Sequence, residues 1–401
     1  MTTLDSESQA RSERVFTVSG QDWDDLVDSV RMRAAAQPGD ERIVVNMGPQ
    51  HPSTHGVLRV MLEIDGEYIL RAEPVLGYIH RMHEKMAEGK TYAQFITNMG
   101  RVDYLHALAW NWAFVGAVEK LGGTPPTPRA EYLRVITCEL NRLSSHLLWW
   151  GAYLLDLGAF TPILYAFDDR EELLDIMQEM TGSRLTYASF TFGGVVADMS
   201  DELKIRIGAF IKRMRERLPM YKALVTDNFI LLGRVEDIGF IPKEMAVRYG
   251  ATGPVLRGSG VAYDVRRAEP YSVYPELDFA IPTSDRTDAL GRYLVRMQEM
   301  EQCLNILEQA ILQIPEGDIQ AKMPKKPKVP AGEVYFAVEG ARGKIGLYLQ
   351  SNGGDKPYRV KLRAPSFSNL SLFAELGQGT LLADAVSILG SLDLVIPEID
   401  R

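Results

Sequence analysis

One run of regularly spaced apolar residues constrains the fold of this 401-residue chain more than any other feature. Between residues 130 and 157, large apolar side chains recur at alternating spacings of three and four: Leu133, Ile136, Leu140, Leu143, Leu147, Trp150 and Leu154. This spacing places them on one face of an α-helix, as a seam that packs against another helix. Glu139, Arg142 and His146 fall together on another face, which we expect to be a polar stripe exposed to solvent or to a partner.

Strand patterns flank the helical region on both sides. Before it, a short strand over residues 42–47 precedes a hairpin over residues 57–72, whose turn is Asp65-Gly66. After it, three alternating apolar and polar runs within residues 333–363 predict a three-stranded meander. Further helices are expected at residues 168–181, 200–226, 285–314 and 381–390. This order predicts an α+β fold, a mainly helical core with antiparallel strands at both ends, rather than βαβ repeats.

The same pattern divides the chain into five segments. They are an N-terminal arm (1–41), an N-terminal β region with a histidine loop (42–80), a helical core (81–314), a linker rich in proline and lysine (315–332), and a C-terminal β meander with a helix and tail (333–401).

Composition excludes several classes of protein. Apolar residues make up 46% of the chain and charged residues 24%, as in a globular protein with a well-formed core. The net charge of -9 argues against nucleic-acid binding, which needs a basic face. The two cysteines, Cys138 and Cys303, are too few for a disulfide framework or for an iron–sulfur or nickel centre held by this chain alone. These features favour a protein on the cytosolic side.

The stretch from Leu147 to Phe167 has the length of a membrane span. However, Asp156, Gly158 and Pro162 interrupt it, so we expect a buried core helix that ends near Gly158. Contact with a membrane would then occur through partners.

All six histidines lie between residues 51 and 146, and two of them, His51 and His55, share the segment Gly48–Gly56. Histidine is the side chain best suited to proton transfer near neutral pH. A metal pair at this spacing would need a helix, which Pro52 and Gly56 disfavour. A structural loop and a polar substrate pocket both remain open, and we favour the pocket.

Several long motifs resemble the quinone-binding, 49-kDa-type (D-type) subunit of the NADH–quinone oxidoreductase known as respiratory complex I. They are NMGPQHPSTHGVLR (46–59), GYIHRMHEK (77–85), RVDYLHA (101–107), PRAEYLRVITCELNRLSSHL (128–147), LLDLGAFTPILYAF (154–167), LRGSGVAYDVRRAEPY (256–271) and EIDR (398–401). The resemblance extends from about residue 42 to the last residue. It implies the fold of the large subunit of nickel–iron hydrogenases.

Hydrogenase large subunits hold nickel with two CxxC pairs, one near each end of the chain. Where the first pair would stand, this chain has Asp103 and His106, and near the C-terminus it has DLVIPE (393–398). No cysteine occurs at either place, so the thiolates that select nickel and iron are missing. The sequence therefore excludes a working hydrogenase and predicts that this chain binds no metal.

The resemblance implies that the corresponding cavity receives the headgroup of a quinone, the substrate. Reduction by two electrons puts charge on both ring oxygens, which then need hydrogen-bond donors and protons. His55 and Tyr104 match the two headgroup ligands of the family, and Asp156 matches the carboxylate that pairs with the histidine. His51 and Asp103 are expected to support them. The residues alone leave other interpretations open, since Tyr104 fits a core tyrosine and Asp156 a helix-end residue.

The chain has no nucleotide-binding motif and no redox cofactor of its own, so electrons must come from a partner. The resemblance implies a [4Fe–4S] cluster in a neighbouring subunit, NAD bound elsewhere in the complex, and Arg81 close to the cluster. Arg81 also fits a surface ion pair. The implied partners are the cluster-carrying subunit, the C-type peripheral protein of the complex and the membrane subunit that forms the quinone channel. The implied location is the cytoplasmic face of the cell membrane, as a peripheral protein.

Two alternative functions remain open on the sequence alone. One is the corresponding subunit of a complex that takes electrons from ferredoxin or a deazaflavin, and the other is a non-catalytic scaffold. Thr186 stands where the family usually has a histidine that couples cluster reduction to protonation, so that coupling is in doubt here.

Overall fold

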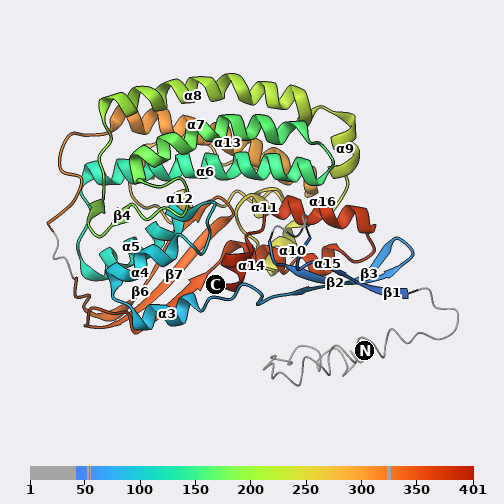
Figure 1. The fold of residues 1–401 in the computed structure, drawn as a ribbon, viewed down its shortest axis with the longest axis horizontal. Helices are drawn as coiled ribbons and strands as arrows, with labels where there is room; N and C mark the ends of the chain where they lie inside the picture. Colours follow the sequence, from blue (N-terminus) through green and yellow to red (C-terminus); the bar gives the residue numbers. More distant parts are fainter. Residues whose placement is uncertain (1–41, 52–53, 55, 323–326) are drawn as a thin grey trace.

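A layer of long helices covers a second layer of sheets and short helices (Figure 1). The computed structural model describes residues 42–51, 54, 56–322 and 327–401. The upper layer consists of α6 (Pro128–Asp156), α7 (Thr161–Thr181), α8 (Asp201–Tyr221) and α13 (Ala289–Gln313). Below α6, α5 (Ala107–Gly122) packs on the C-terminal sheet. The predicted α+β class is confirmed.

Helix α6 lies at the centre of the molecule. The predicted seam is confirmed, because all seven of its apolar side chains are buried. The predicted polar stripe is wrong: Glu139, Arg142 and His146 each have 0% of their surface exposed. The reason is that α5, α7, α13 and α16 (Leu382–Leu392) all pack on α6, so that every residue from Ala130 to Leu154 is buried or half-buried.

The N-terminal sheet contains β1 (Arg42–Met47), β2 (Arg59–Asp65) and β3 (Tyr68–Val75), antiparallel and in that order. The predicted hairpin turn is confirmed, and Gly66 adopts the left-handed conformation that it requires, with φ +59°. One face of this sheet joins a second hydrophobic core with the C-terminal helices, which include Leu389 and Ile399.

The predicted C-terminal meander is also confirmed. It consists of β6 (Ala331–Gly340), β7 (Gly343–Asn352) and β8 (Arg359–Arg363). A tight turn places Arg342 between β6 and β7. Gly253 approaches this turn so closely that a Cβ atom there would lie 2.3 Å from the carbonyl oxygen of Arg342. Only glycine fits this contact, which holds the turn against α11 (Gly253–Arg257).

The stretch from 147 to 167 is divided between two helices, as expected. Helix α6 ends at Asp156 and α7 begins at Thr161, seven residues earlier than predicted, because Pro162 is tolerated in the first turn of a helix. Within the described ranges, no helix combines the length and apolar character that crossing a membrane requires.

Shorter elements complete the chain. They are α3 (His83–Gly89), α4 (Tyr92–Met99), β4 (Phe190–Thr191), β5 (Gly194–Val195), a π-helical turn (Lys222–Thr226), α9 (Phe229–Val235), α10 (Lys243–Arg248), α12 (Val265–Ala268), a 3-10 turn (Tyr274–Glu276), α14 (Pro365–Leu370), α15 (Phe373–Leu376) and α17 (Ile396–Asp400). The C-terminal tail is not peripheral, since residues 392–400 are buried.

Candidate functional site

Tyr104 lies in the loop between α4 and α5, next to the buried carboxylate of Asp103. Asp103 Oδ1 accepts hydrogen bonds from the backbone N–H groups of Leu105 (2.8 Å) and His106 (3.1 Å). These two bonds close a tight turn, which fixes the backbone on either side of Tyr104. The Tyr104 side chain is half-buried.

Arg342 joins Asp103 to the C-terminal segment. Its Nη1 donates to Asp103 Oδ2 (3.2 Å) and to Ser145 Oγ (2.8 Å), and its Nη2 donates to Asp393 Oδ1 (3.2 Å). Arg296 of α13 lies beyond Asp393, with its guanidinium 4.4 Å from the centre of the Trp149 ring. We call Asp103, Arg342, Asp393 and Arg296 the carboxylate–arginine cluster. All four side chains are buried.

Burial, more than the charges of this cluster, shifts the pKa of Tyr104. Burial, followed by the negative charge of Asp103, raises the pKa of Tyr104 above its ordinary value, while the positive charge of Arg342 opposes the shift. The hydroxyl therefore keeps its proton at neutral pH. A protonated phenol at the edge of a buried charge cluster is a hydrogen-bond donor for an oxyanion.

Glu398 is a second buried acid near Asp103. One carboxylate oxygen accepts from the indole N–H of Trp110 (3.1 Å) and the other from the backbone N–H of Ser366 (2.8 Å). Burial and the charge of Asp103 raise the pKa of Glu398 to about 7. This carboxyl group therefore changes its protonation state near neutral pH, in the same region of the fold as Tyr104.

The histidine loop lies next to the C-terminal helix. His51 is exposed and pairs with Gly56 in an isolated β-bridge, and the hydroxyl of buried Thr54 donates to the carbonyl of His51 (2.8 Å). A Cβ atom at Gly56 would lie 3.5 Å from the side chain of Ile396 in α17. The loop is thus close to the segment that carries Glu398. His55 lies outside the described residues, so the structure does not place the predicted headgroup ligand.

Asp156 is the last residue of α6, and its side chain is half-buried. Ser145, which contacts Arg342, lies eleven residues earlier on the same helix. At a rise of 1.5 Å per residue, the two positions are about 16 Å apart along the helix axis. The structure therefore brings Asp103 and Tyr104 together but keeps Asp156 out of the carboxylate–arginine cluster. The predicted pair of Asp156 with His55 remains a prediction.

Arg81 is exposed, in the segment between β3 and α3. This segment is tied to the end of the chain, because the carboxylate of Asp400 accepts backbone N–H bonds from Gly77 and Ile79, both 2.9 Å. Burial, followed by the charge of Arg81, lowers the pKa of His83 to about 4. The exposed position of Arg81 leaves it accessible to a partner, and its predicted contact with one remains a prediction.

Three members of the carboxylate–arginine cluster, and Glu398, were not predicted as site residues. The segment DLVIPE holds two of them, Asp393 and Glu398, and it was singled out only for its missing cysteines. Carboxylates in place of the thiolates were a signal available in the sequence. Nothing local marks Arg342 as a site residue, because its partners Asp103 and Asp393 are distant in the chain.

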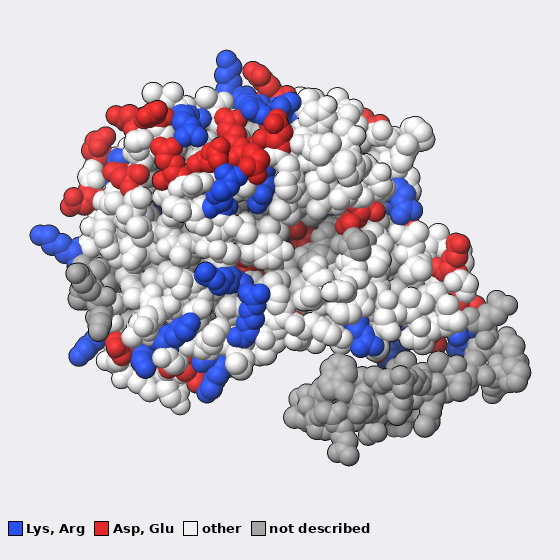
Figure 2. Space-filling model, viewed as in Figure 1, with Lys and Arg blue, Asp and Glu red and all other residues white. Residues whose placement is uncertain are grey.

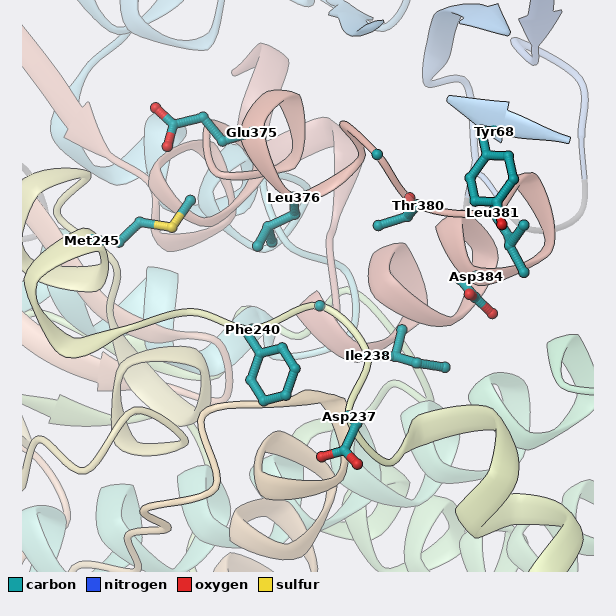
Figure 3. A pocket seen from close by; sticks show the side chains of 12 residues that line it. Tyr68, Asp237, Ile238, Phe240, Met245, Glu375, Leu376, Thr380, Leu381 and Asp384 are labelled. Carbon is teal, nitrogen blue, oxygen red and sulfur yellow. The ribbon is translucent and has the colours of Figure 1, made fainter. Parts of the chain in front are cut away.

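A surface cavity of about 510 Å³ opens between β3, α10 and α16 (Figure 3). Its apolar floor includes Ile238, Phe240 and Leu376, and acidic side chains including Asp237, Glu375 and Asp384 lie around it. None of the predicted site residues lines this cavity. Among the described residues, no group of three or more histidine, cysteine or acidic side chains is arranged to hold a metal ion.

Comparison with known proteins identifies the family. Residues 156–328 and 321–401 match the family described as the 49 kDa subunit of respiratory-chain NADH dehydrogenase. The D-type NADH-quinone oxidoreductase subunit of Desulfotalea psychrophila is 57% identical over 363 residues, which cover 90% of this chain and 98% of that protein. This chain belongs to the 49 kDa subunit family. A D-type NADH-quinone oxidoreductase subunit of Opitutus terrae is 56% identical over 90% of this chain and 91% of its own length.

Membership in the 49 kDa family confirms the resemblance seen in the motifs. The chain is a subunit of an NADH–quinone oxidoreductase of the respiratory chain. Its fold matches a chain in the structure of the membrane-bound sulfane sulfur reductase, an archaeal respiratory membrane complex, with a TM-score of 0.88 and 34% identity. That match covers 91% of this chain and 100% of the other.

Proposed function

We propose that this subunit forms the site where the quinone headgroup is reduced, and that Tyr104 donates a hydrogen bond to one ring oxygen. The observation that carries the proposal is the position of Tyr104, half-buried and protonated beside the carboxylate–arginine cluster. Two electrons and two protons convert the quinone to its quinol. A neutral donor stabilises charge that develops on the ring oxygen, without the cost of burying another ion.

In this proposal His55 meets the other ring oxygen, and Asp156 orients the imidazole and stabilises its protonated form. His51 supports the loop through its carbonyl, which accepts from Thr54. Asp103 supports Tyr104 through the turn that it closes. The position of Gly56 against Ile396 favours this arrangement, because it places the loop beside the C-terminal segment.

Electrons reach the quinone from a [4Fe–4S] cluster in an adjacent subunit, and NAD binds elsewhere in the complex. Two exposed arginines, Arg81 and Arg101, support this part of the proposal. A cation near a cluster stabilises its more negative, reduced form and so raises its reduction potential. We further propose that quinone reduction is coupled to proton translocation.

Apolar side chains exposed at one end of the helical layer fit a membrane subunit as a partner. Phe160, between α6 and α7, is 64% exposed, Leu164, near the start of α7, is 58% exposed, and Phe229, in α9, is 80% exposed. Figure 2 shows that the face near α9 is largely uncharged, whereas acidic and basic side chains alternate along the upper helices. Large apolar patches of this kind mark interfaces. We propose that this end faces the quinone-channel subunit, on the cytoplasmic side of the membrane.

The other proposed partners are the cluster-carrying subunit, near Arg81, and the C-type peripheral protein of the complex. A complex with a different electron donor, ferredoxin or a deazaflavin, is the second candidate. The observation in its favour is the close fold match to a chain of the sulfane sulfur reductase complex, whose name mentions neither NADH nor quinone. A flavoprotein that oxidises NADH should copurify only in the first case.

Tyr104→Phe in the intact complex tests the proposal, because it removes the hydroxyl and keeps the ring. We expect quinone reduction to fall on the order of 10–1000-fold, as when other oxyanion donors are deleted. Electron transfer to an artificial acceptor that bypasses the quinone site should not change. Full quinone reductase activity in this variant would remove Tyr104 from the mechanism, and equal losses in both assays would show a structural role.

A further inference from the structure

The surface cavity between β3, α10 and α16 has no part in the proposed quinone site. Its 12 lining residues include three carboxylates, Asp237, Glu375 and Asp384, and no lysine or arginine. Figure 3 shows these acids around a floor that contains Phe240 and Leu376. An apolar hollow with an acidic margin is complementary to a partner that presents an apolar side chain beside a cation.

The negative charge at this cavity is only partly balanced within the described part of the chain. Asp237 in the wall, and Asp65 and Glu67 at the adjacent β2–β3 turn, are exposed and form no ion pair with the described residues. The other two lining acids, Glu375 and Asp384, each have one arginine nearby, at 3.1 Å and 3.9 Å. An excess of negative charge therefore remains for a partner to balance.

The start of α13 holds the cavity wall at residues 237–240 in place from behind. Asp237 has a left-handed backbone conformation, φ +58°, which residues other than glycine rarely adopt. Its N–H donates to Asp288 Oδ2 (3.1 Å), and the carbonyl of Gly239 accepts from Arg292 Nη1 (2.9 Å). Asp288 and Arg292 are both buried. A wall fixed in this way loses little conformational freedom when a partner binds.

The cavity adjoins the exposed apolar end of the helical layer. Helix α9, which carries the exposed Phe229, ends at Val235, two residues before Asp237. Arg234 of α9 donates a hydrogen bond to the carbonyl of Ala383 in α16 (3.0 Å), so that α9 is tied to the helix on the other side of the cavity. A partner that covers α9 therefore lies beside the cavity as well.

We propose that a segment of the quinone-channel membrane subunit binds in this cavity. It places an apolar side chain on Phe240 and Leu376, and a lysine or arginine beside Asp237 and Asp384. This inference rests on the proposed function, which puts that subunit at α9. Cytoplasmic loops of membrane proteins carry an excess of lysine and arginine, as the acidic margin requires. Lipid headgroups fit less well, because the cytoplasmic leaflet is itself negatively charged and is repelled by these acids.

Crosslinking in the intact membrane complex tests the identity of the occupant. A benzophenone amino acid in place of Phe240, which is 48% exposed, should crosslink on illumination to the membrane subunit, at a segment that contains a lysine or arginine. The same replacement of Ile205, which is 73% exposed on α8, is the control and should not crosslink to that subunit. At position 240, a product with lipid or with a different subunit would overturn the proposal. So would the lack of any product in a complex that reduces quinone normally.

Charge variants test the acidic margin. Asp237→Asn combined with Asp384→Asn removes two negative charges, and asparagine tolerates the left-handed backbone at position 237. We expect the salt concentration that releases half of this subunit from the membrane to fall roughly twofold, since fewer charges need to be screened. Asp201→Asn combined with Glu216→Gln is the matched control, because both acids are exposed on α8, away from the cavity. Equal release of the two double variants would overturn the proposal.

The outcomes separate this inference from the proposed function. If Tyr104 has no role in quinone reduction, Tyr104→Phe reduces quinone at the normal rate. If α9 does not face the membrane subunit, a benzophenone amino acid in place of Phe229 does not crosslink to it. If only the cavity inference fails, Tyr104→Phe is slow and position 229 crosslinks to the membrane subunit, but position 240 does not.

Discussion

Arg342 and Asp103 are 239 positions apart in the chain, yet their side chains form a buried ion pair with Nη1 3.2 Å from Oδ2. The pair ties the β6–β7 turn to the loop that carries Tyr104. The other terminal nitrogen of the guanidinium, Nη2, donates a hydrogen bond to Asp393 and so links the turn to the C-terminal segment as well. Three distant parts of the sequence thus meet at one side chain.

Arg342→Met should destabilise the subunit by about 3–5 kcal/mol, because it leaves two buried carboxylates without their cation. The loss of stability is measured by heating the purified complex and using release of this subunit as the signal for unfolding. Arg184→Met is the control, since its ion pairs with Glu171 and Asp175 are exposed and should contribute little to stability. Equal effects of the two substitutions would contradict the importance assigned to Arg342.

His55 and Asp156 should act as one unit. If Asp156 orients and stabilises the imidazole as proposed, Asp156→Asn removes that charge, so quinone reduction should fall while electron entry into the complex stays normal. Adding His55→Ala to Asp156→Asn should then cause little further loss, since coupled residues are not additive. The measurement is the quinone reductase rate of both single variants and the double variant. Losses that multiply would show that the two residues act independently.

Arg81→Met should lower the reduction potential of the [4Fe–4S] cluster proposed in the neighbouring subunit. Removal of one nearby cation favours the oxidised form, and an interaction of about 1 kcal/mol corresponds to a shift on the order of 50 mV. Redox titration of the cluster by electron paramagnetic resonance measures the potential. Lys85→Met serves as a control, because Lys85 is exposed and already paired with Glu88. A potential unchanged by Arg81→Met would favour a surface ion pair as the role of that residue.

Glu398 should titrate near neutral pH. Its pKa is raised to about 7 from an ordinary value of 4.5, so the carboxyl group is protonated below about pH 7 and ionised above it. An infrared difference spectrum between about pH 6 and about pH 8 should show loss of a carboxylic acid C=O band as pH rises. Glu398→Gln should abolish that band. If the band stays in the variant, another buried acid titrates in this range.

Ionisation of Glu398 should also strengthen the hydrogen bond from Trp110, because a bond to a charged acceptor is stronger. The resonance Raman signals of the indole N–H should therefore shift over the same pH range and lose this shift in Glu398→Gln.

The sequence by itself determined the features that depend on neighbouring residues. The spacing of Leu133 to Leu154 predicted a helix with one face packed on another helix, Asp65-Gly66 predicted a hairpin, and alternation predicted the C-terminal meander. These patterns work because helix and strand periods place side chains on defined faces within a few residues. The motifs around Tyr104 identified the family, which the comparisons confirm.

Only the tertiary structure decided what surrounds α6 and what completes the site. In sequence, Glu139 and His146 resemble a polar stripe exposed to solvent. In the structure, four other helices enclose α6, and Glu139 pairs with Arg266 of α12 while His146 pairs with Glu299 of α13. Arg342 gains its role from residues 239 and 51 positions away. The energy of a buried charge depends on which opposite charge lies within a few ångströms, and chain topology, rather than local sequence, determines that distance.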